Sequence, residues 1–133
     1  MVSEPQNQVH LQDVAQIAFT VRNLAEAKSF YGDVLELKFL FDAGTMAFFQ
    51  CGSVRLVIGE AVKPSISEGT IVYFRVDDLE ATARLLESRG ISFVQQPHLV
   101  ARMKSHDLWM AFLKDPAGNT LGLMSEIART RAC

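Results

Sequence analysis

The chain has 133 residues, about the length of one domain, and its 49% hydrophobic and 21% charged residues exclude a disordered chain. The formal net charge of -2 lacks the basic surplus of proteins that bind nucleic acids or anionic membranes, and no apolar run approaches the ~20 residues of a membrane span. Two cysteines are too few for a disulfide framework. We therefore expect a soluble cytoplasmic protein with neither nucleic-acid nor membrane partners.

The first half of the chain predicts a strand, a helix and three further strands. Residues 15–21 alternate between apolar and polar side chains, which is the period of a half-buried strand. Asn23 followed by Glu26 is typical of a helix start, and apolar residues then recur at helical spacing over 24–35. The segments LKFLF, MAFFQ and VRLVIG, separated by DAGT and by a turn at Gly52, predict the three strands.

The second half repeats this order from residue 69. TIVYFRVDDL alternates as a strand, Asp78 is suited to cap the helix LEATARLLESR, and Gly90 stands where a left-handed C-cap glycine belongs. The strand segments that follow are ISFV, HLVAR, LWMAFLK and NTLGLMS. Because element order, caps and strand parity repeat together, the sequence predicts two tandem βαβββ modules.

Composition changes mark the boundaries of these modules. AVKPSISEG carries the proline and glycine that are typical of a linker. The expected organisation is a mobile N-terminal arm at 1–12, a single domain at 13–126 with modules at 14–60 and 69–126 and a linker at 61–68, and a C-terminal tail at 127–133.

Three stretches carry a family resemblance: FTVRNLAEAKSFYGDVLELKF, YFRVDDLEATARLLESRGISF and AFLKDPAGNTLGLMSE, with DPxGN as the closing turn. In combination they resemble the vicinal oxygen chelate superfamily of glyoxalases, bleomycin-resistance proteins and extradiol dioxygenases. The resemblance covers about residues 14–126. It implies an α+β fold in which the two modules form a curved mixed sheet around a cavity, and it implies a homodimer.

The metal-dependent members of this superfamily take their ligands from equivalent strand positions of both modules. The resemblance places these positions at Gln16, Leu56, Ile71 and Gly122. Only Gln16 carries a side-chain donor, and one neutral amide cannot replace the water shell of a divalent ion. The sequence also has no glycine-rich phosphate-binding pattern. We therefore predict a protein without the superfamily metal and without any other cofactor.

A relocated site is the alternative. His98 and His106 flank a possible hairpin with Asp107 beside His106, and such a group could bind a metal ion or transfer protons. This alternative is a metal-dependent glyoxalase-type lyase, isomerase or dioxygenase, to which Glu126 could contribute. The opposite interpretation assigns His106 and Asp107 to turn chemistry and His98 to a strand end. Cys51 lies in a turn without a neighbouring activating group, so we do not expect nucleophilic catalysis.

Strand parity predicts which side chains line the cavity, because the helices must cover the opposite, apolar parity. The expected ligand-binding residues are Gln16, Thr20, Tyr73, Arg75, Trp109, Thr120 and Met124. Arg75 could pair with a substrate carboxylate or phosphate, or form a salt bridge to a surface acid. Trp109 could stack on a planar ligand or belong to core or dimer packing. The phenylalanines expected in the core are Phe41, Phe48, Phe49 and Phe112.

The preferred interpretation is a metal-independent binding protein, similar to the bleomycin-binding sequestration members of the superfamily. It holds a small apolar or aromatic molecule between its modules. Whether the protein is also an enzyme stays open from the sequence.

Overall fold

The computed structural model describes residues 12–63 and 71–129. Most of the predicted arm and linker, and the end of the predicted tail, lie outside the described residues. The first module contains β1 (Gln16–Val21), α1 (Leu24–Lys28), the π-helical segment η1 (Ser29–Val34), β2 (Lys38–Ala43), β3 (Met46–Cys51) and β4 (Val54–Glu60). The second contains β5 (Val72–Arg75), α2 (Leu79–Ser88), β6 (Phe93–Arg102), β7 (His106–Lys114) and β8 (Thr120–Ala128). Among these elements, no helix is long and apolar enough to cross a membrane.

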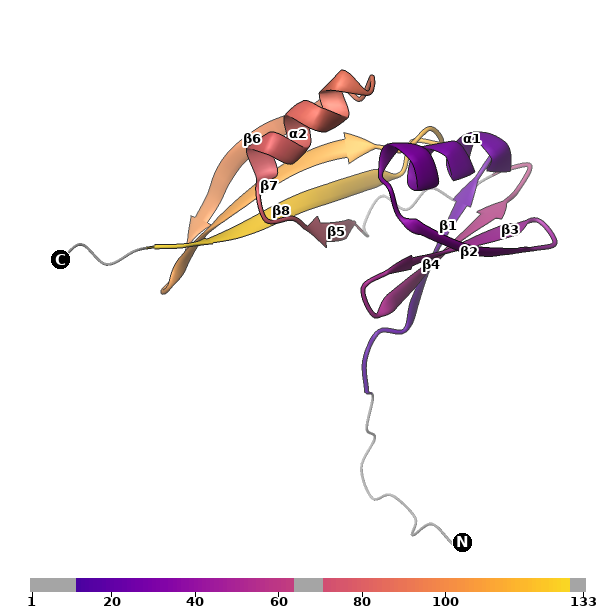
Figure 1. The fold of residues 1–133 in the computed structure, drawn as a ribbon, viewed down its shortest axis with the longest axis horizontal. Coiled ribbons are helices and arrows are strands. Elements are labelled where there is room, and N and C mark those ends of the chain that lie inside the picture. The colour runs from indigo at the N-terminus through magenta and orange to yellow at the C-terminus, as the bar shows by residue number, and fades with distance from the viewer. Residues whose placement is uncertain (1–11, 64–70, 130–133) are drawn as a thin grey trace, which may run out of the picture.

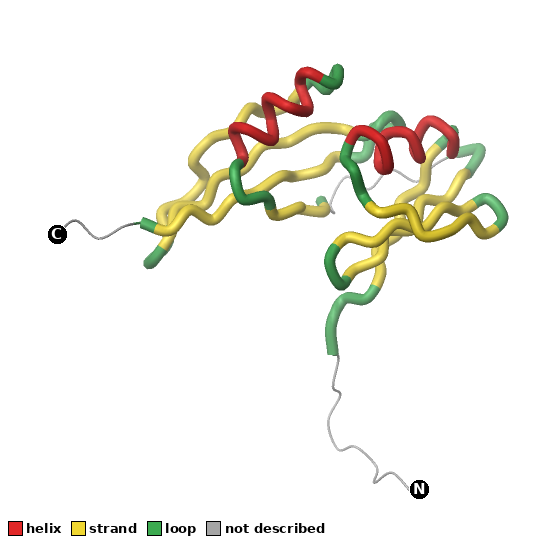
Figure 2. The backbone as a smooth tube through the Cα atoms, in the orientation of Figure 1, coloured by secondary structure: helices red, strands yellow, loops and turns green. Residues whose placement is uncertain are grey.

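Each module forms its own four-stranded mixed sheet. The strand orders are β1-β4-β3-β2 and β5-β8-β7-β6, with β1 parallel to β4 and β5 parallel to β8. The two modules lie side by side with α1 and α2 on the same side of their sheets (Figure 1), and short loops join the elements within each module (Figure 2). The predicted α+β fold of two βαβββ modules is confirmed.

The predicted helix caps form as expected. The Glu26 N–H donates to Asn23 Oδ1 at 3.0 Å, and the Ala81 N–H donates to Asp78 Oδ1 at 3.0 Å. Gly90 has a φ of 91°, the left-handed conformation that ends α2. Each cap satisfies a backbone donor that the first turn of its helix leaves without a partner.

The first helix differs from the predicted regular α-helix. After Lys28 it widens into η1, where the Leu35 N–H donates to Phe30 O at 2.9 Å, five residues back. This wider turn carries the adjacent Phe30 and Tyr31, and both side chains are buried. A π-helical turn is rare and changes which side chains a helix presents to its neighbours.

Strand alternation gives each sheet a helix side and a helix-free face. The helix side holds the core: alternate residues of the central strands, such as Ile58 and Leu123, are buried against the helices. As predicted, Phe19 and Phe74 pack on this side. The opposite parity therefore points away from both helices, and this is the surface on which the candidate site is found.

Two strand irregularities were not predicted. The pairing of β2 with β3 skips Leu40, so that Phe39 pairs with Phe49 and Phe41 with Phe48. In the second module ISFV and HLVAR are parts of a single strand, β6, whose pairing with β7 shifts around Pro97. Proline cannot donate to a ladder, so it is tolerated here because β6 is an edge strand. At the other end, β8 continues through Ala128 into the predicted tail.

A buried carboxylate joins the two modules. The Tyr31 hydroxyl of the first module donates to Asp115 Oδ2 at 2.8 Å, in the DPxGN turn of the second. Asn119 Nδ2 donates to the same oxygen at 2.8 Å and to Thr20 O of β1 at 3.2 Å. The backbone N–H groups of Ala117 and Asn119 donate to Asp115 Oδ1. The carboxylate is therefore fully hydrogen-bonded although only 4% of the residue is exposed.

A second contact between the modules lies at the end of α2. Arg89 donates from Nη1 to Val34 O at 2.7 Å, and its Nη2 lies 2.7 Å from Glu36 Oε2. The guanidinium thus bonds to a carbonyl at the end of η1 and to a neighbouring carboxylate. Together with the Asp115 cluster, it fixes the two modules at two separate points.

We predict that Tyr31→Phe lowers the free energy of unfolding by about 1–2 kcal/mol, because Asp115 loses one buried hydrogen bond but keeps three others. Asp115→Ala should cost more, since it leaves the Tyr31 hydroxyl and the N–H groups of Ala117 and Asn119 without their acceptor. Urea denaturation followed by circular dichroism measures both. Equal stability of Tyr31→Phe and the native protein would contradict this role.

The Tyr31–Asp115 pair also predicts that the stability of the protein depends on pH in the alkaline range. Burial, and secondarily the Asp115 carboxylate, raise the pKa of Tyr31 well above its ordinary value. The folded protein therefore keeps the phenol proton while the unfolded chain loses it above about pH 10. The free energy of unfolding should fall as the pH rises above that value, and it should fall less steeply in Tyr31→Phe.

Candidate functional site

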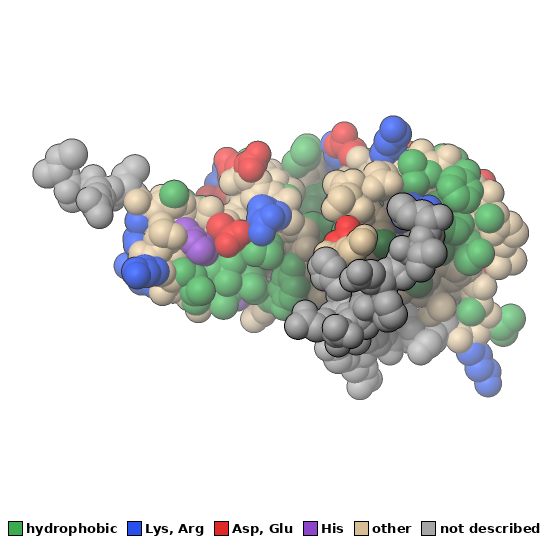
Figure 3. Space-filling model, turned by 90° about the horizontal axis from the view of Figure 1, so that it is seen from below, with side chains coloured by type: hydrophobic (Ala, Val, Ile, Leu, Met, Phe, Trp, Pro, Cys, Tyr) green, Lys and Arg blue, Asp and Glu red, His purple; other side chains and the backbone are tan. Residues whose placement is uncertain are grey.

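The helix-free face of the second sheet combines apolar and ionisable side chains. We call it the second helix-free face. Its register follows from Ala111 and Leu113, which are buried on the helix side of β7, so that the residues between them point the other way. The side chains on this face include those of Tyr73, Arg75, His98, His106, Leu108, Met110, Phe112, Lys114, Thr120, Met124 and Glu126, with Gly122 between them. In the view from below, a hydrophobic patch lies beside histidine, acidic and basic side chains (Figure 3).

Aromatic rings form the apolar part of this face. Tyr73 and Phe112 meet edge to face with ring centroids 5.8 Å apart, and the His98 ring lies 6.4 Å from Phe112. Tyr73 lies directly over Gly122: a Cβ atom there would stand 2.7 Å from Tyr73 Cε1 and closer still to Cδ1. Because Tyr73 is 42% exposed, its ring offers a surface to solvent.

A charged cluster borders the rings. Arg75 donates to Glu126 Oε1 from Nε at 3.0 Å, with Nη2 at 2.9 Å. The other carboxylate oxygen, Oε2, lies 3.1 Å from His106 Nε2, and His106 Nδ1 lies 3.3 Å from Ser105 Oγ. Three strands thus contribute one residue each to an Arg75–Glu126–His106 cluster. The side chain of Arg75 is 69% exposed, so the cluster is open to ligands.

The first sheet has a corresponding surface, which we call the first helix-free face. Gln16, Ala18 and Thr20 alternate with the core residues of β1 and lie on it, as predicted from parity. Phe41 and Phe48 stack here with centroids 4.5 Å apart, on the row of Ala18. Both phenylalanines were expected in the core. Phe41 lies outside the core because the pairing of β2 with β3 skips Leu40, and no pattern in the sequence predicts this irregularity.

The four superfamily ligand positions carry no set of metal donors. Gln16, Ile71 and Gly122 have the parity of the helix-free faces, but Leu56 was assigned to the wrong face: it is 1% exposed and lies in the core. Ala18 pairs with Val57 as Tyr73 pairs with Gly122, so Val57 takes the equivalent position. Valine, isoleucine and glycine have no side-chain donor, and the Tyr73 ring fills the space over Gly122. The residues do not fit the superfamily metal.

The alternative site predicted at His98, His106 and Asp107 does not come together in the structure either. His98 pairs with Met110, whereas His106 pairs with Ala128 at the far end of β7. Four residues of strand therefore separate their rows, about 13 Å at the usual rise. Asp107 points to the helix side, where it pairs with Arg129 at 2.5 Å. Within the described ranges, no three His, Cys, Asp or Glu side chains group so as to hold a metal ion.

Trp109 lies on the helix side, away from the other residues predicted to bind a ligand, which agrees with the core-packing alternative. It alternates with Ala111 on the helix side and packs against the core, in a hollow between the start of α2 and β6. Conversely, Phe112 was expected in the core and faces away from the helices. The alternation of Trp109, Ala111 and Leu113 could have separated the two groups from the sequence. Thr120 and Met124, by contrast, have the parity of the second helix-free face.

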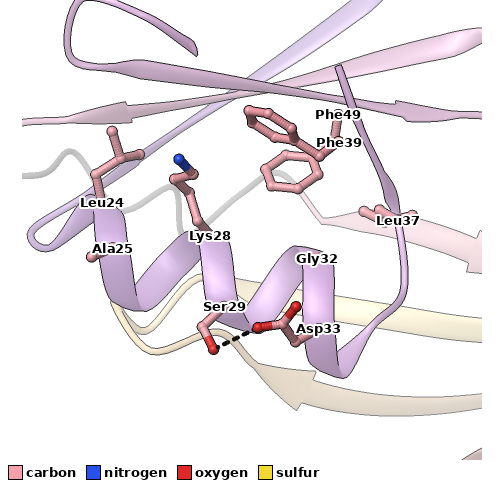
Figure 4. Close-up of a pocket in the computed structure, with 9 residues that line it drawn as sticks. All are labelled: Leu24, Ala25, Lys28, Ser29, Gly32, Asp33, Leu37, Phe39 and Phe49. Atoms are coloured by element: carbon pink, nitrogen blue, oxygen red, sulfur yellow. Dashed lines mark hydrogen bonds between the residues drawn. The ribbon is translucent and has the colours of Figure 1, made fainter. Parts of the chain in front are cut away.

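A hollow of about 590 Å³ lies elsewhere, between the first helix and β2–β3. Figure 4 shows Phe39 and Phe49 along one wall and the helix along the other. Its polar side chains already have partners: Lys28 pairs with Asp42 at 3.0 Å and lies over the Phe39 ring, and Ser29 donates to Asp33 at 3.2 Å. We place the candidate site on the second helix-free face instead, because a solvent-exposed aromatic ring, Tyr73, lies there beside the exposed side chain of Arg75.

Cys51 gives no support to nucleophilic catalysis. It lies at the end of β3, and partial burial raises the pKa of its thiol. A raised pKa lowers the fraction of thiolate, which is the reactive form. The other cysteine, Cys133, lies outside the described residues.

Solved structures with a similar fold cover nearly the whole chain. A putative glyoxalase family protein from Bacillus anthracis has a TM-score of 0.76 at 18% identity, over 90% of this chain and 98% of its own. Lactoylglutathione lyase from Agrobacterium tumefaciens has a TM-score of 0.71 at 20% identity, over 87% and 95%. A glyoxalase/bleomycin resistance protein/dioxygenase from Alicyclobacillus acidocaldarius has a TM-score of 0.70 at 21% identity, over 86% and 92%. At these identities the likeness shows the fold alone.

Sequence comparison identifies the family. Among curated proteins, no relative matches the chain. The family model of the Glyoxalase/Bleomycin resistance protein/Dioxygenase superfamily matches residues 13–123, which span the first module and the second as far as the start of β8. With the two βαβββ modules in place, the chain belongs to the Glyoxalase/Bleomycin resistance protein/Dioxygenase superfamily.

Proposed function

We propose that this protein binds a small apolar or aromatic molecule on its second helix-free face without a metal ion. The observation that carries the proposal is the contact of the exposed Tyr73 ring with the half-buried Phe112 ring beside the Arg75–Glu126–His106 cluster. Small-molecule sites typically combine an apolar surface with a few polar groups that fix orientation. The absence of donors at Val57, Ile71 and Gly122 supports binding without the superfamily metal.

A homodimer is part of the proposal. The second helix-free face is an open surface, and a ligand on it would stay largely in contact with water. The first helix-free face also exposes an aromatic residue, since Phe41 is 46% exposed. We propose that the first face of one copy covers the second face of another, which would bury both and enclose the ligand. The small number of cysteines supports the proposed cytoplasmic location.

Metal analysis tests the metal-independent part of the proposal. Protein purified without a polyhistidine tag should contain far less than one Mn²⁺, Zn²⁺ or Fe²⁺ per chain. Added metal or chelator should shift the melting temperature by less than about 1 °C, because only a ligand bound to the folded state raises stability. Stoichiometric metal with a shift of several degrees would contradict the proposal.

Neutral 2-naphthamide tests the apolar surface. In NMR titrations it should perturb the backbone amide signals of β5, β7 and β8. Phe112→Leu keeps an apolar side chain but removes the ring, so it should weaken binding by about fivefold, the equivalent of ~1 kcal/mol of aromatic contact. Leu85→Ala, at an exposed position on α2, is the matched control and should leave binding unchanged. Absence of any perturbation of these strands would contradict the proposal.

Sedimentation velocity tests the homodimer. The native protein should sediment as a dimer at micromolar concentration. Phe41→Asp places a charge on the first helix-free face and should favour the monomer, because an unpaired charge is costly to bury. Leu85→Asp introduces the same charge on the helix side and should leave the dimer intact. A native protein that stays monomeric at all concentrations would refute this part.

A further inference from the structure

We infer that the molecule bound on the second helix-free face carries a carboxylate, which pairs with the guanidinium of Arg75. The inference rests on the proposed function and adds the chemical class of the ligand. It follows from the way Glu126 occupies one edge of Arg75 and leaves another edge open.

The guanidinium has donors left for a ligand. Both of its contacts to Glu126, through Nε and Nη2, go to the single oxygen Oε1. An arginine has five N–H donors in a fixed plane, so the Nη1–Nη2 edge still presents a parallel pair of N–H groups. That geometry suits a carboxylate bound through both oxygens. The 69% exposure of the Arg75 side chain lets a ligand reach this edge.

The cluster holds the guanidinium in place. Glu126 is itself bonded on its other oxygen by His106, which has Ser105 on its second nitrogen. A side chain that is already positioned loses less conformational freedom when the ligand binds. Arg75 therefore offers its free edge from a fixed position beside the apolar surface.

The apolar surface lies within reach of the same ligand. Arg75 pairs with Met124, and Tyr73 lies two residues along β5 on the same face. At the rise of a strand, the two Cα atoms are about 7 Å apart. The Arg75 guanidinium reaches toward Glu126, one row beyond Met124, whereas the Tyr73 ring lies over Gly122. A rigid aromatic acid that spans the Met124 row would place its ring against Tyr73 while its carboxylate meets Arg75. The expected ligand is an aryl or similarly apolar monocarboxylate.

The charge balance favours a single negative charge. Arg75 contributes one positive charge and Glu126 one negative charge, so the pair is neutral, and His106 adds at most one positive charge. Another cation of this face, Lys114, lies at the opposite end of the apolar surface, two residues beyond Phe112 on β7. Such a cluster attracts a monoanion only moderately and compensates a dianionic phosphate poorly. Glu126 therefore limits the affinity for the ligand that Arg75 pairs with.

A matched pair of ligands tests the inference: 2-naphthoate and the neutral 2-naphthamide, which have the same ring and nearly the same size. Isothermal titration should give an affinity for 2-naphthoate about tenfold higher, as expected for a charge-assisted bidentate contact. Arg75→Gln should abolish this preference by weakening 2-naphthoate alone. Arg84→Gln removes an exposed arginine that is likewise paired with a glutamate, on α2, and should change neither affinity.

Glu126→Gln tests the inference in the opposite direction, because it should raise the affinity for 2-naphthoate that Arg75→Gln lowers. It keeps the size of the side chain and an oxygen that accepts from Arg75, but it removes the competing negative charge. The affinity for 2-naphthoate should therefore rise several-fold, while that for 2-naphthamide stays the same. Circular dichroism confirms that each variant is folded before titration.

The outcomes distinguish failure of the carboxylate inference from failure of the proposed function. If both ligands bind the native protein equally and Arg75→Gln affects neither, the apolar site stands and the carboxylate inference is overturned. If neither ligand binds at all, the proposed function fails and the inference fails with it. Tighter binding of 2-naphthoate that depends on Arg75 and increases in Glu126→Gln supports both.

Discussion

The carboxylate of Asp115 is the group on which the arrangement of the two modules depends. It accepts from Tyr31 across the module boundary, and its turn partner Asn119 reaches back to the carbonyl of Thr20. A buried charge without these donors would cost several kcal/mol, so the turn and the first module stabilise each other. The helix-free faces of both sheets are oriented by this junction, although none of its side chains belongs to the candidate site.

The two sides of each sheet contribute differently to the stability of the fold. The helix side provides the stability, with a continuous apolar core that includes Phe49 and Ile58 from the first module and Leu113 and Leu121 from the second. The helix-free faces keep polar, aromatic and charged side chains that the core does not require. This separation explains how one scaffold persists while the metal donors of the superfamily are replaced.

The features that the sequence predicts correctly are those that depend on residues close together in the chain. Caps at Asn23 and Asp78, the left-handed Gly90 and strand parity depend on nearby residues, and the fold prediction built on them is confirmed. Register is different, because a one-residue shift moves a side chain to the other face. That is why Leu56 was placed where Val57 lies, and why the skipped Leu40 misplaced Phe41. The Arg75–Glu126–His106 cluster joins three strands, and only their pairing brings it together.

The contact between Tyr73 and Gly122 restricts which residue position 122 can carry. The ring occupies the space that any larger residue at position 122 would need, since even a Cβ atom would overlap it. A glutamate could not be accommodated at this position by a single substitution without displacing the tyrosine. The two residues would have to change in order, the ring before the glycine, and the intermediate would lack both the Tyr73 ring and a side-chain donor at position 122. While the ring fills this space, position 122 cannot supply a metal ligand.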